Sequence, residues 1–357
     1  MKRKGRKYTM KNYMKVKFRF IAILFLVFTI ACSSETDTSN TESSDAEAKS
    51  DEGETYTINI AHGNQSEEPI GELASKWKEL AEERSEGRLE LKLYPNSQLG
   101  AEKDVVEQAV TGNNVIVMTG YDFLMDYVPD VGILTAPYLV EDFDDLLYLT
   151  ETEWFEGIRE DLRKQNIEII NSTTVYGERH LLTNEKVTST EDLEGLKIRV
   201  PDNQMSIETF NAMGASATPY PLGELYTALQ QGLVDGAENP LPVLQGVKAH
   251  EVSKHLTLTG HQKFITSWIT GTEFIETIPD DLVQILRETG NEAAEYAQGV
   301  LEEQTAQVLE EFESSGVKVH EMDTEPFKEK VQSVYEEFPE WTPGLYDNIQ
   351  ELLENRD

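Results

Sequence analysis

The sequence predicts an α/β fold of two lobes braced by a long helix, and three observations lead to this fold class. The chain has 357 residues, too many for one ordinary core, and 39% of them are hydrophobic. Strand-like and helix-like patterns alternate from Tyr56 onward, which predicts a parallel sheet. Residues 280–315 keep helical spacing almost without interruption. A helix of that length would reach about 54 Å, which is longer than either lobe.

The first 31 residues have the pattern of a signal peptide. They contain nine Lys and Arg and no acidic residue, and the apolar run 20–30 is too short to span a bilayer. Either Met1 or Met14 can be the true start, because both give a charged beginning. The run ends at Cys32, the only cysteine, in Thr29-Ile-Ala-Cys32. This motif resembles a lipobox, although Thr29 stands where Leu is usual. We expect Cys32 to be lipidated; the alternative is an ordinary secretory signal.

Residues 32–55 are expected to form a lipid-anchored, disordered, acidic tether. From Ser33 to Thr55 the chain has no aromatic residue and no aliphatic residue larger than alanine. Such a segment cannot offset the entropy lost on ordering. We therefore expect an extracytoplasmic domain attached to the cell membrane, which would lie in the periplasmic space if the cell has an outer membrane.

The composition is strongly acidic. The formal net charge is −35, and beyond the first 31 residues 22 basic residues face 66 acidic ones, a net charge of −44. Such a surface repels nucleic acid, so no nucleic-acid partner is expected. The acidity fits either an ordinary solvated surface or an adaptation to high salt. The single cysteine excludes intramolecular disulfides and metal sites built from several thiolates.

The stretch from Gly195 to Pro240 is the most informative for function. As a strand, residues 195–201 direct Lys197 and Arg199 to one side and apolar residues to the other. A second short strand, expected at Leu233-Val234, leads to the loop with Asn239. Ligands of open α/β sheets lie beyond the carboxyl ends of the strands. Arg199 and Asn239 therefore mark the expected site, and the planar guanidinium of Arg199 suits a carboxylate.

Six motifs in one order carry a family resemblance. They are Tyr94-Pro-Asn-Ser-Gln-Leu-Gly100, Gly195-Leu-Lys-Ile-Arg-Val-Pro201, Met213-Gly-Ala215, Glu224-Leu-Tyr-Thr-Ala-Leu-Gln230, Val234-Asp-Gly-Ala-Glu-Asn-Pro240 and Leu256-Thr-Leu-Thr-Gly-His261. This set resembles the substrate-binding proteins of tripartite ATP-independent periplasmic (TRAP) transporters, the DctP family. The resemblance covers the chain from about Tyr56 to Asp357.

The resemblance implies a periplasmic-binding-protein-like, two-lobed fold of the Venus flytrap type. Lobe I would comprise residues 56–175 and 263–304, and lobe II residues 176–262 and 305–357. The implied function is that of an extracytoplasmic solute-binding subunit, which captures a small organic carboxylate, either a sugar acid or a C4-dicarboxylate. This subunit would deliver the anion to the TRAP permease, as a monomer and without a cofactor.

The resemblance also implies which residues bind the ligand. Arg199 would hold the carboxylate. Arg179, twenty residues earlier, would be a second positive centre, with a structural salt bridge as the alternative. Asn239 matches the family's ligand-contacting asparagine, and a turn residue before proline is its alternative. Further residues on segments expected to face the cleft are His62, Glu67, Tyr121, Tyr176, His261 and Trp268. Glu67 and the aromatic residues favour a polyhydroxylated sugar acid over a plain dicarboxylate.

Catalytic motifs are absent from the sequence. It has no Gly-x-Ser-x-Gly, His-Glu-x-x-His, phosphate-loop or calcium-loop pattern. His250, His255 and His261 fit no single helical face, so no metal site is expected. We therefore expect a protein that is not an enzyme. Two alternatives are a two-lobed binding protein serving an ABC transporter or a sensor kinase, and a lipid-anchored polysaccharide hydrolase.

Overall fold

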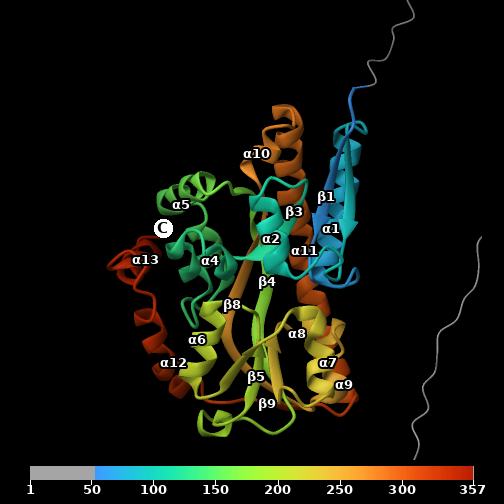
Figure 1. Cartoon of the computed structure of the whole chain (residues 1–357). Helices are drawn as coiled ribbons and strands as arrows, with labels where there is room; N and C mark the ends of the chain where they lie inside the picture. The colour runs from blue at the N-terminus through green and yellow to red at the C-terminus, as the bar shows by residue number, and fades with distance from the viewer. Residues whose placement is uncertain (1–52, 357) are drawn as a thin grey trace, which may run out of the picture. The chain divides into compact units, whose positions relative to one another are not determined.

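The computed structural model describes residues 53–356, which belong to one compact unit, Glu52–Asp357. Within these residues nine strands form one sheet in the order β2-β1-β3-β8-β4-β7-β5-β6, and β9 pairs with β8. Figure 1 shows β1 and β3 in the upper half, β5 in the lower half, and β4 and β8 running through both. The strands are β1 (Tyr56–Ala61), β2 (Leu89–Tyr94), β3 (Ile116–Gly120), β4 (Glu168–Thr183), β5 (Lys197–Val200), β6 (Ser216–Pro219), β7 (Gly236–Asn239), β8 (His255–Thr270) and β9 (Lys318–His320).

The strands β4 and β8 connect the two halves. Each has 16 residues, and they pair antiparallel along most of their length. Strands β1, β2 and β3 are parallel to one another in the upper half, and β5, β6 and β7 are parallel in the lower half. The predicted α/β, two-lobed fold class is confirmed.

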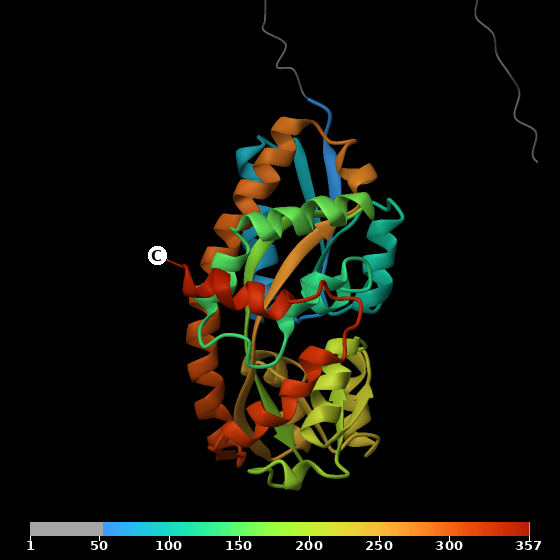
Figure 2. The same ribbon diagram turned by 90° about the vertical axis from the view of Figure 1, so that its left-hand side faces the viewer.

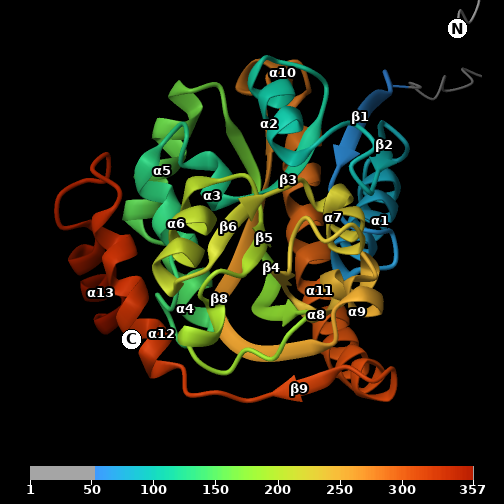
Figure 3. The ribbon, with the colours of Figure 1, turned by 60° about the horizontal axis from the view of Figure 1, so that its bottom comes forward.

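Helices cover the sheet in both halves. In the view from below, α6 lies on one side of the lower strands, and α7, α8 and α9 lie on the other (Figure 3). The α-helices are α1 (Pro69–Arg84), α2 (Glu102–Val110), α3 (Tyr121–Leu124), α4 (Phe143–Leu149), α5 (Glu153–Lys164), α6 (Gln204–Met213), α7 (Leu225–Gln230), α8 (Leu241–Gly246), α9 (Ala249–Val252), α10 (Thr272–Ile275), α11 (Asp280–Ser314), α12 (Glu325–Val331) and α13 (Leu345–Glu354). Short 3₁₀ helices are η1 (Pro129–Thr135), η2 (Glu191–Leu193), η3 (Leu222–Glu224) and η4 (Gln332–Glu336).

The long helix α11 braces both halves, as the sequence predicts. It has 35 residues, and its apolar side chains enter two different cores: Leu282 and Leu286 pack in the upper one, and Val308 and Phe312 in the lower one. Gly290 has a packing role, because a Cβ there would lie 3.1 Å from the ring of Trp77. The close approach of α1 and α11 therefore depends on this glycine.

One predicted strand lies elsewhere. The sequence predicts a strand at Leu233-Val234. The strand found there, β7, begins at Gly236, two residues after the predicted strand ends. Gly236 lies against Thr183 of β4, where a Cβ would come within 2.5 Å of that side chain. The glycine thus allows β7 to pair closely with β4. The shift brings Glu238, and not only Asn239, into a buried strand.

The C-terminal segment contacts both halves. The helix α12 packs against α6 in the lower half and α13 packs against α4 in the upper half, as Figure 2 shows. Tyr335 Oη donates to the main-chain oxygen of Pro137 at 2.7 Å, and Trp341 Nε1 donates to that of Pro129 at 2.9 Å. These partners lie in predicted lobe I, although residues 305–357 were assigned to lobe II. The lobe boundaries therefore stay a prediction.

The predicted signal peptide, Cys32 and the predicted tether up to residue 52 lie outside the described residues. Between residues 53 and 356, no helix has both the length and the apolar character that a membrane span requires.

Candidate functional site

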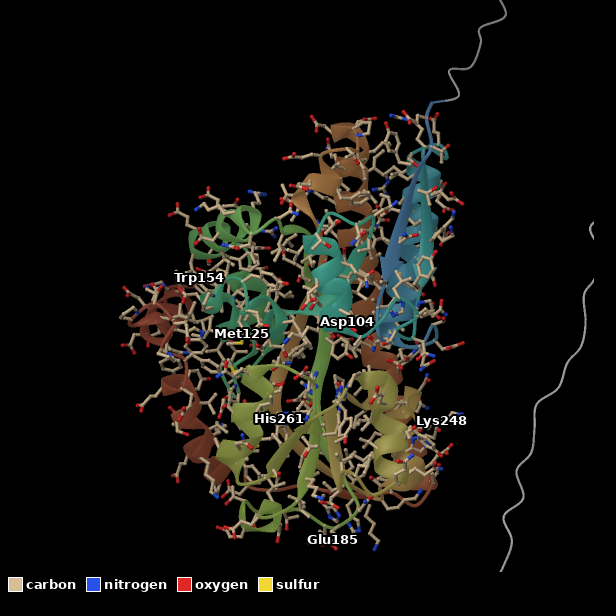
Figure 4. The ribbon with its side chains drawn as sticks, in the orientation of Figure 1. Asp104, Met125, Trp154, Glu185, Lys248 and His261 are labelled. Carbon is tan, nitrogen blue, oxygen red and sulfur yellow. The ribbon has the colours of Figure 1, made fainter. Side chains whose placement is uncertain are left out.

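A group of buried polar residues lines a cavity between the two halves, which we call the central cavity. It encloses about 380 Å³, and a wider cavity of about 800 Å³ adjoins it and shares Arg199, Tyr176 and Glu102 with it. Figure 4 shows Asp104, which lines the wider cavity, in the upper half above His261 in the lower half. The central cavity is lined by Glu102, Met118, Gly120, Asp122, Phe123, Tyr176, Arg179, Arg199, Pro201, Leu222, Asn239, Phe264 and Thr266.

Arg199 brings a buried positive charge to this cavity. The residue, next to last in β5, is 3% exposed. Its Nε and Nη2 donate to the main-chain oxygen of Tyr220, and no carboxylate of residues 53–356 forms an ion pair with it. Burial, and to a lesser extent the nearby Arg179, lowers the pKa of Arg199 to about 10. An anion in the cavity would therefore stabilise this guanidinium.

Arg179, by contrast, has a carboxylate partner. Its Nε and Nη2 donate to the two carboxylate oxygens of Glu238 at 2.6 and 2.7 Å, and both side chains are buried. Nε2 of His261 lies 3.3 Å from the same carboxylate. Burial acts to raise the pKa of Glu238, but Arg179 and His261 outweigh it and lower the value to about 2. Arg179 thus forms a structural salt bridge, which is the alternative to ligand binding that the sequence left open for this residue. Its side chain still lines the cavity.

Asn239 and Tyr176 complete the set of predicted residues at the central cavity. Asn239 is the last residue of β7 and is 2% exposed. Its side-chain amide forms no hydrogen bond within the described part of the chain, so it can both donate to and accept from a ligand. Tyr176 Oη accepts a hydrogen bond from Asn64 at 3.2 Å, and the tyrosine ring packs edge to face on Phe264.

Two acidic residues that the sequence reasoning missed line the same cavity. Glu102 begins α2, and its Oε1 accepts hydrogen bonds from Thr119 and from the main chain of Gly120. Asp122 lies in α3, directly after Tyr121. Burial raises the pKa of both carboxyl groups, that of Asp122 to about 7. Glu102 follows the motif that ends at Gly100, and that position was the available signal.

Two predicted aromatic residues belong to the hydrophobic cores. Tyr121 is fully buried, and its Oη donates to the main-chain oxygen of Ser172 at 2.8 Å. Trp268 is fully buried as well, and its ring packs edge to face on Trp77 at a centroid distance of 5.4 Å. Neither ring lines the central cavity: Tyr121 is the first residue of α3 and packs edge to face on Phe155 of α5, whereas Trp268 of β8 points towards α1.

Three further predicted residues lie apart from the central cavity. His62 lines a smaller neighbouring cavity and packs edge to face on Trp268, and burial lowers its pKa to about 4. Glu67 is exposed and lines a separate pocket beside α8. His261 does not line the central cavity, but it contacts Glu238.

The histidines do not gather at one point. His250 stacks on Phe312, while His255 stacks on His320 at a centroid distance of 5.2 Å. Across residues 53–356, no three His, Cys, Asp or Glu side chains are arranged to hold a metal ion.

Comparisons with known proteins show which family the chain belongs to. Residues 60–340 match the family described as bacterial extracellular solute-binding protein, family 7, also called DctP. The sialic acid-binding periplasmic protein SiaP of Vibrio cholerae is 33% identical over 262 residues, which cover 72% of this chain and 80% of that protein.

Two solved structures of TRAP periplasmic solute-binding proteins are also similar. The protein from Ochrobacterium anthropi, with bound L-fuconate, is 40% identical with a TM-score of 0.82, and the match covers 84% of this chain and 99% of that one. The protein from Actinobacillus succinogenes, with bound L-galactonate, is 39% identical with a TM-score of 0.83, and the match covers 84% and 100%. The family match spans most of the chain and the fold agrees throughout. The chain is therefore a member of family 7 of the bacterial extracellular solute-binding proteins, the DctP family.

Proposed function

We propose that this protein is the extracytoplasmic solute-binding subunit of a TRAP transporter and that it captures a sugar acid with one carboxylate. The bound anion would pass to the permease without any bond being made or broken. The two similar structures at 40% and 39% identity hold L-fuconate and L-galactonate, and each of these ligands is a polyhydroxylated acid with a single carboxylate.

The observation that carries the proposal is the difference between the two cavity arginines. Glu238 neutralises Arg179, whereas Arg199 donates only to a neutral carbonyl oxygen. A buried charge without a counterion in the protein is costly, so the site favours an anion. The ligand's carboxylate would meet Arg199 and the amide of Asn239.

The remaining polar groups favour hydroxyls over a second carboxylate. Glu102 and Asp122 line the cavity, and burial raises the pKa of each. In either protonation state these groups can form a hydrogen bond with a sugar hydroxyl, whereas a second ligand carboxylate would be repelled by their ionised forms and could enter only if they took up protons. Among the cavity-lining residues, Arg199 is the one cation without a carboxylate partner. This arrangement supports an aldonate over a C4-dicarboxylate or an aldarate.

The test is a pair of ligands that differ in one group. Galactonate and galactarate share a six-carbon skeleton, and only galactarate carries a carboxylate at both ends. Calorimetry on residues 52–357 should show saturable binding of L-galactonate without turnover, and much weaker binding of galactarate and succinate. Glu102→Gln should reduce the difference in affinity between galactonate and galactarate. Equal binding of the two acids by the wild type would contradict the proposed selectivity.

The attachment and assembly of the protein are also part of the proposal. The motif at Cys32 supports a lipid anchor, and the acidic segment up to Thr55 supports a tether that holds the binding domain off the membrane. The domain would act as a monomer. Its membrane partner would be the TRAP permease.

A further inference from the structure

A side-chain hydrogen bond joins the two halves at the wall of the central cavity. Asp122 lies in α3 of the upper half, and Asn203 precedes α6 in the lower half. Nδ2 of Asn203 donates to Oδ2 of Asp122 at 2.7 Å. We propose that this pair is a latch: it holds the halves together around the ligand and sets how long the ligand is retained. It acts through the relative position of the halves and not by holding the ligand's carboxylate.

The orientation of Asn203 is fixed from its own half. Its Oδ1 accepts a hydrogen bond from the main-chain N–H of Ser206 at 2.8 Å and so caps α6. A capping oxygen satisfies one of the free N–H groups of the helix start. The amide cannot flip without losing this bond, so its Nδ2 must point towards the opposite half. The donor is therefore already aligned before the halves meet.

The carboxylate of Asp122 is positioned equally firmly. Its Oδ1 accepts a hydrogen bond from the main chain of Phe123 at 3.1 Å. Gly120 leaves room for it, because a Cβ at that position would lie 2.1 Å from Asp122 Oδ1 and 2.9 Å from the ring of Phe264. This glycine has an ordinary φ of −70°, so the position requires glycine for the space that it leaves and not for its backbone conformation.

The bond is shielded from water. Asp122 is 1% exposed and Asn203 is 8% exposed. A hydrogen bond to a carboxylate in such surroundings is stronger than one at the surface. Separation of the halves would expose both groups to water. When the halves close, Asp122 loses its water, and the cost of this dehydration reduces the net free energy that the hydrogen bond contributes. The latch is consequently reversible and suits a protein that must release its ligand.

Exchanging the two residues separates the latch from other roles of these positions. Asn203→Asp keeps a good capping residue for α6 but places two carboxylates opposite each other. The double variant Asp122→Asn with Asn203→Asp restores one donor and one acceptor with the roles reversed. Asn203→Ser removes the latch without adding a charge, because serine also caps the helix but is too short to reach Asp122.

The distance between the halves can be measured directly. Residues 52–357 contain no cysteine, so spin labels can be attached at Glu107→Cys on α2 and Gln231→Cys after α7, both exposed. Pulsed electron paramagnetic resonance, with and without L-galactonate, measures the distance between the two spin labels. Short label-to-label distances should be less populated in Asn203→Asp and Asn203→Ser than in the wild type. Stopped-flow measurements should show galactonate dissociating roughly tenfold faster from both variants, with association changed little. The double variant should restore most of the wild-type distance distribution and most of the wild-type dissociation rate.

The outcomes separate the latch from the proposed function, on which the choice of galactonate rests. If no sugar acid binds, the proposed function fails, and the distances in the ligand-free protein decide the latch alone. The latch is overturned if neither distances nor dissociation differ between the wild type and Asn203→Asp. It is also overturned if the double variant folds, as its circular dichroism and melting show, but does not recover the wild-type distances in the ligand-free protein, where the cavity role of Asp122 plays no part.

Discussion

The guanidinium of Arg199 donates two hydrogen bonds, of 2.9 and 2.6 Å, to the main-chain oxygen of Tyr220. These bonds use Nε and one hydrogen of Nη2, so three N–H groups stay free, and two of them point out from the edge formed by Nη1 and Nη2. The carbonyl orients the planar group without neutralising its charge. A carboxylate can therefore approach the oriented edge and form two parallel hydrogen bonds.

The pair Arg179 and Glu238 should contribute strongly to stability. Glu238→Gln removes the charge and leaves a buried guanidinium without a counterion, which should cost about 3 to 5 kcal/mol of unfolding free energy. Glu178→Gln is the control, because Glu178 pairs with Lys263 but is 36% exposed and should cost about 1 kcal/mol or less. Urea denaturation at pH 7 measures both losses. Equal losses in the two variants would contradict the account.

The same pair predicts a pH dependence with a definite sign. The pKa of Glu238 is lowered to about 2 in the folded protein, below its usual value of 4.5. A lowered carboxyl pKa means that the unfolded chain binds more protons, so the contribution is complete above about pH 4.5 and is lost as the pH falls towards 2. The difference in unfolding free energy between wild type and Glu238→Gln should shrink across this window.

Glu68 predicts the opposite dependence. Burial raises its pKa to about 8, while Oε2 accepts a hydrogen bond from Asn64. The folded protein therefore binds more protons than the unfolded chain between pH 4.5 and 8, and its unfolding free energy falls by up to about 1.4 kcal/mol per pH unit as the pH rises. Glu68→Gln should remove this fall. Its exposed neighbour offers the control, Glu67→Gln, which should follow the wild-type curve; identical slopes in all three proteins would refute the assignment.

Much of the fold could be predicted from the sequence because strong periodic patterns survive in the structure. The helix predicted at 280–315 is α11, and the alternation of strands and helices begins at Tyr56, the first residue of β1, as the sequence indicates. The strand at β7 was misplaced because its four residues are all buried and show no alternation. Its position depends on the contact of Gly236 with β4, which is far away in the sequence.

The candidate site was predictable only in part. Arg199, Arg179, Asn239 and Tyr176 meet at the central cavity, as the strand ends and the motifs indicate. Trp268 does not, because the facing of a side chain on a fully buried strand cannot be read from its pattern. Tyr121 does not either, because it begins the short helix α3 and its ring packs in the hydrophobic core. The carboxyl groups of the cavity were missed because the chain has 66 acidic residues, which hide the few that are buried.

Lipidation at Cys32 is a separate prediction from the sequence. The full chain should become acylated at this residue and remain with the membrane after lysis. Cys32→Ala should release soluble protein or leave the uncleaved precursor, which mass spectrometry and membrane fractionation distinguish. Cys32→Ser serves as a second variant that keeps the size of the side chain. An unacylated wild-type protein with unchanged membrane retention would contradict the prediction.

The most direct test of the central claim is calorimetric titration of L-galactonate into the wild type, Arg199→Ala and Arg199→Lys. Removing one partner of a buried charge pair commonly costs 2 kcal/mol or more, so Arg199→Ala should bind at least about thirtyfold more weakly. Arg199→Lys keeps the charge but loses the planar edge, and it should not recover wild-type affinity. Circular dichroism should show all three proteins folded. Wild-type affinity in the lysine variant would mean that charge alone matters, and wild-type affinity in the alanine variant would contradict the claim that Arg199 holds the ligand.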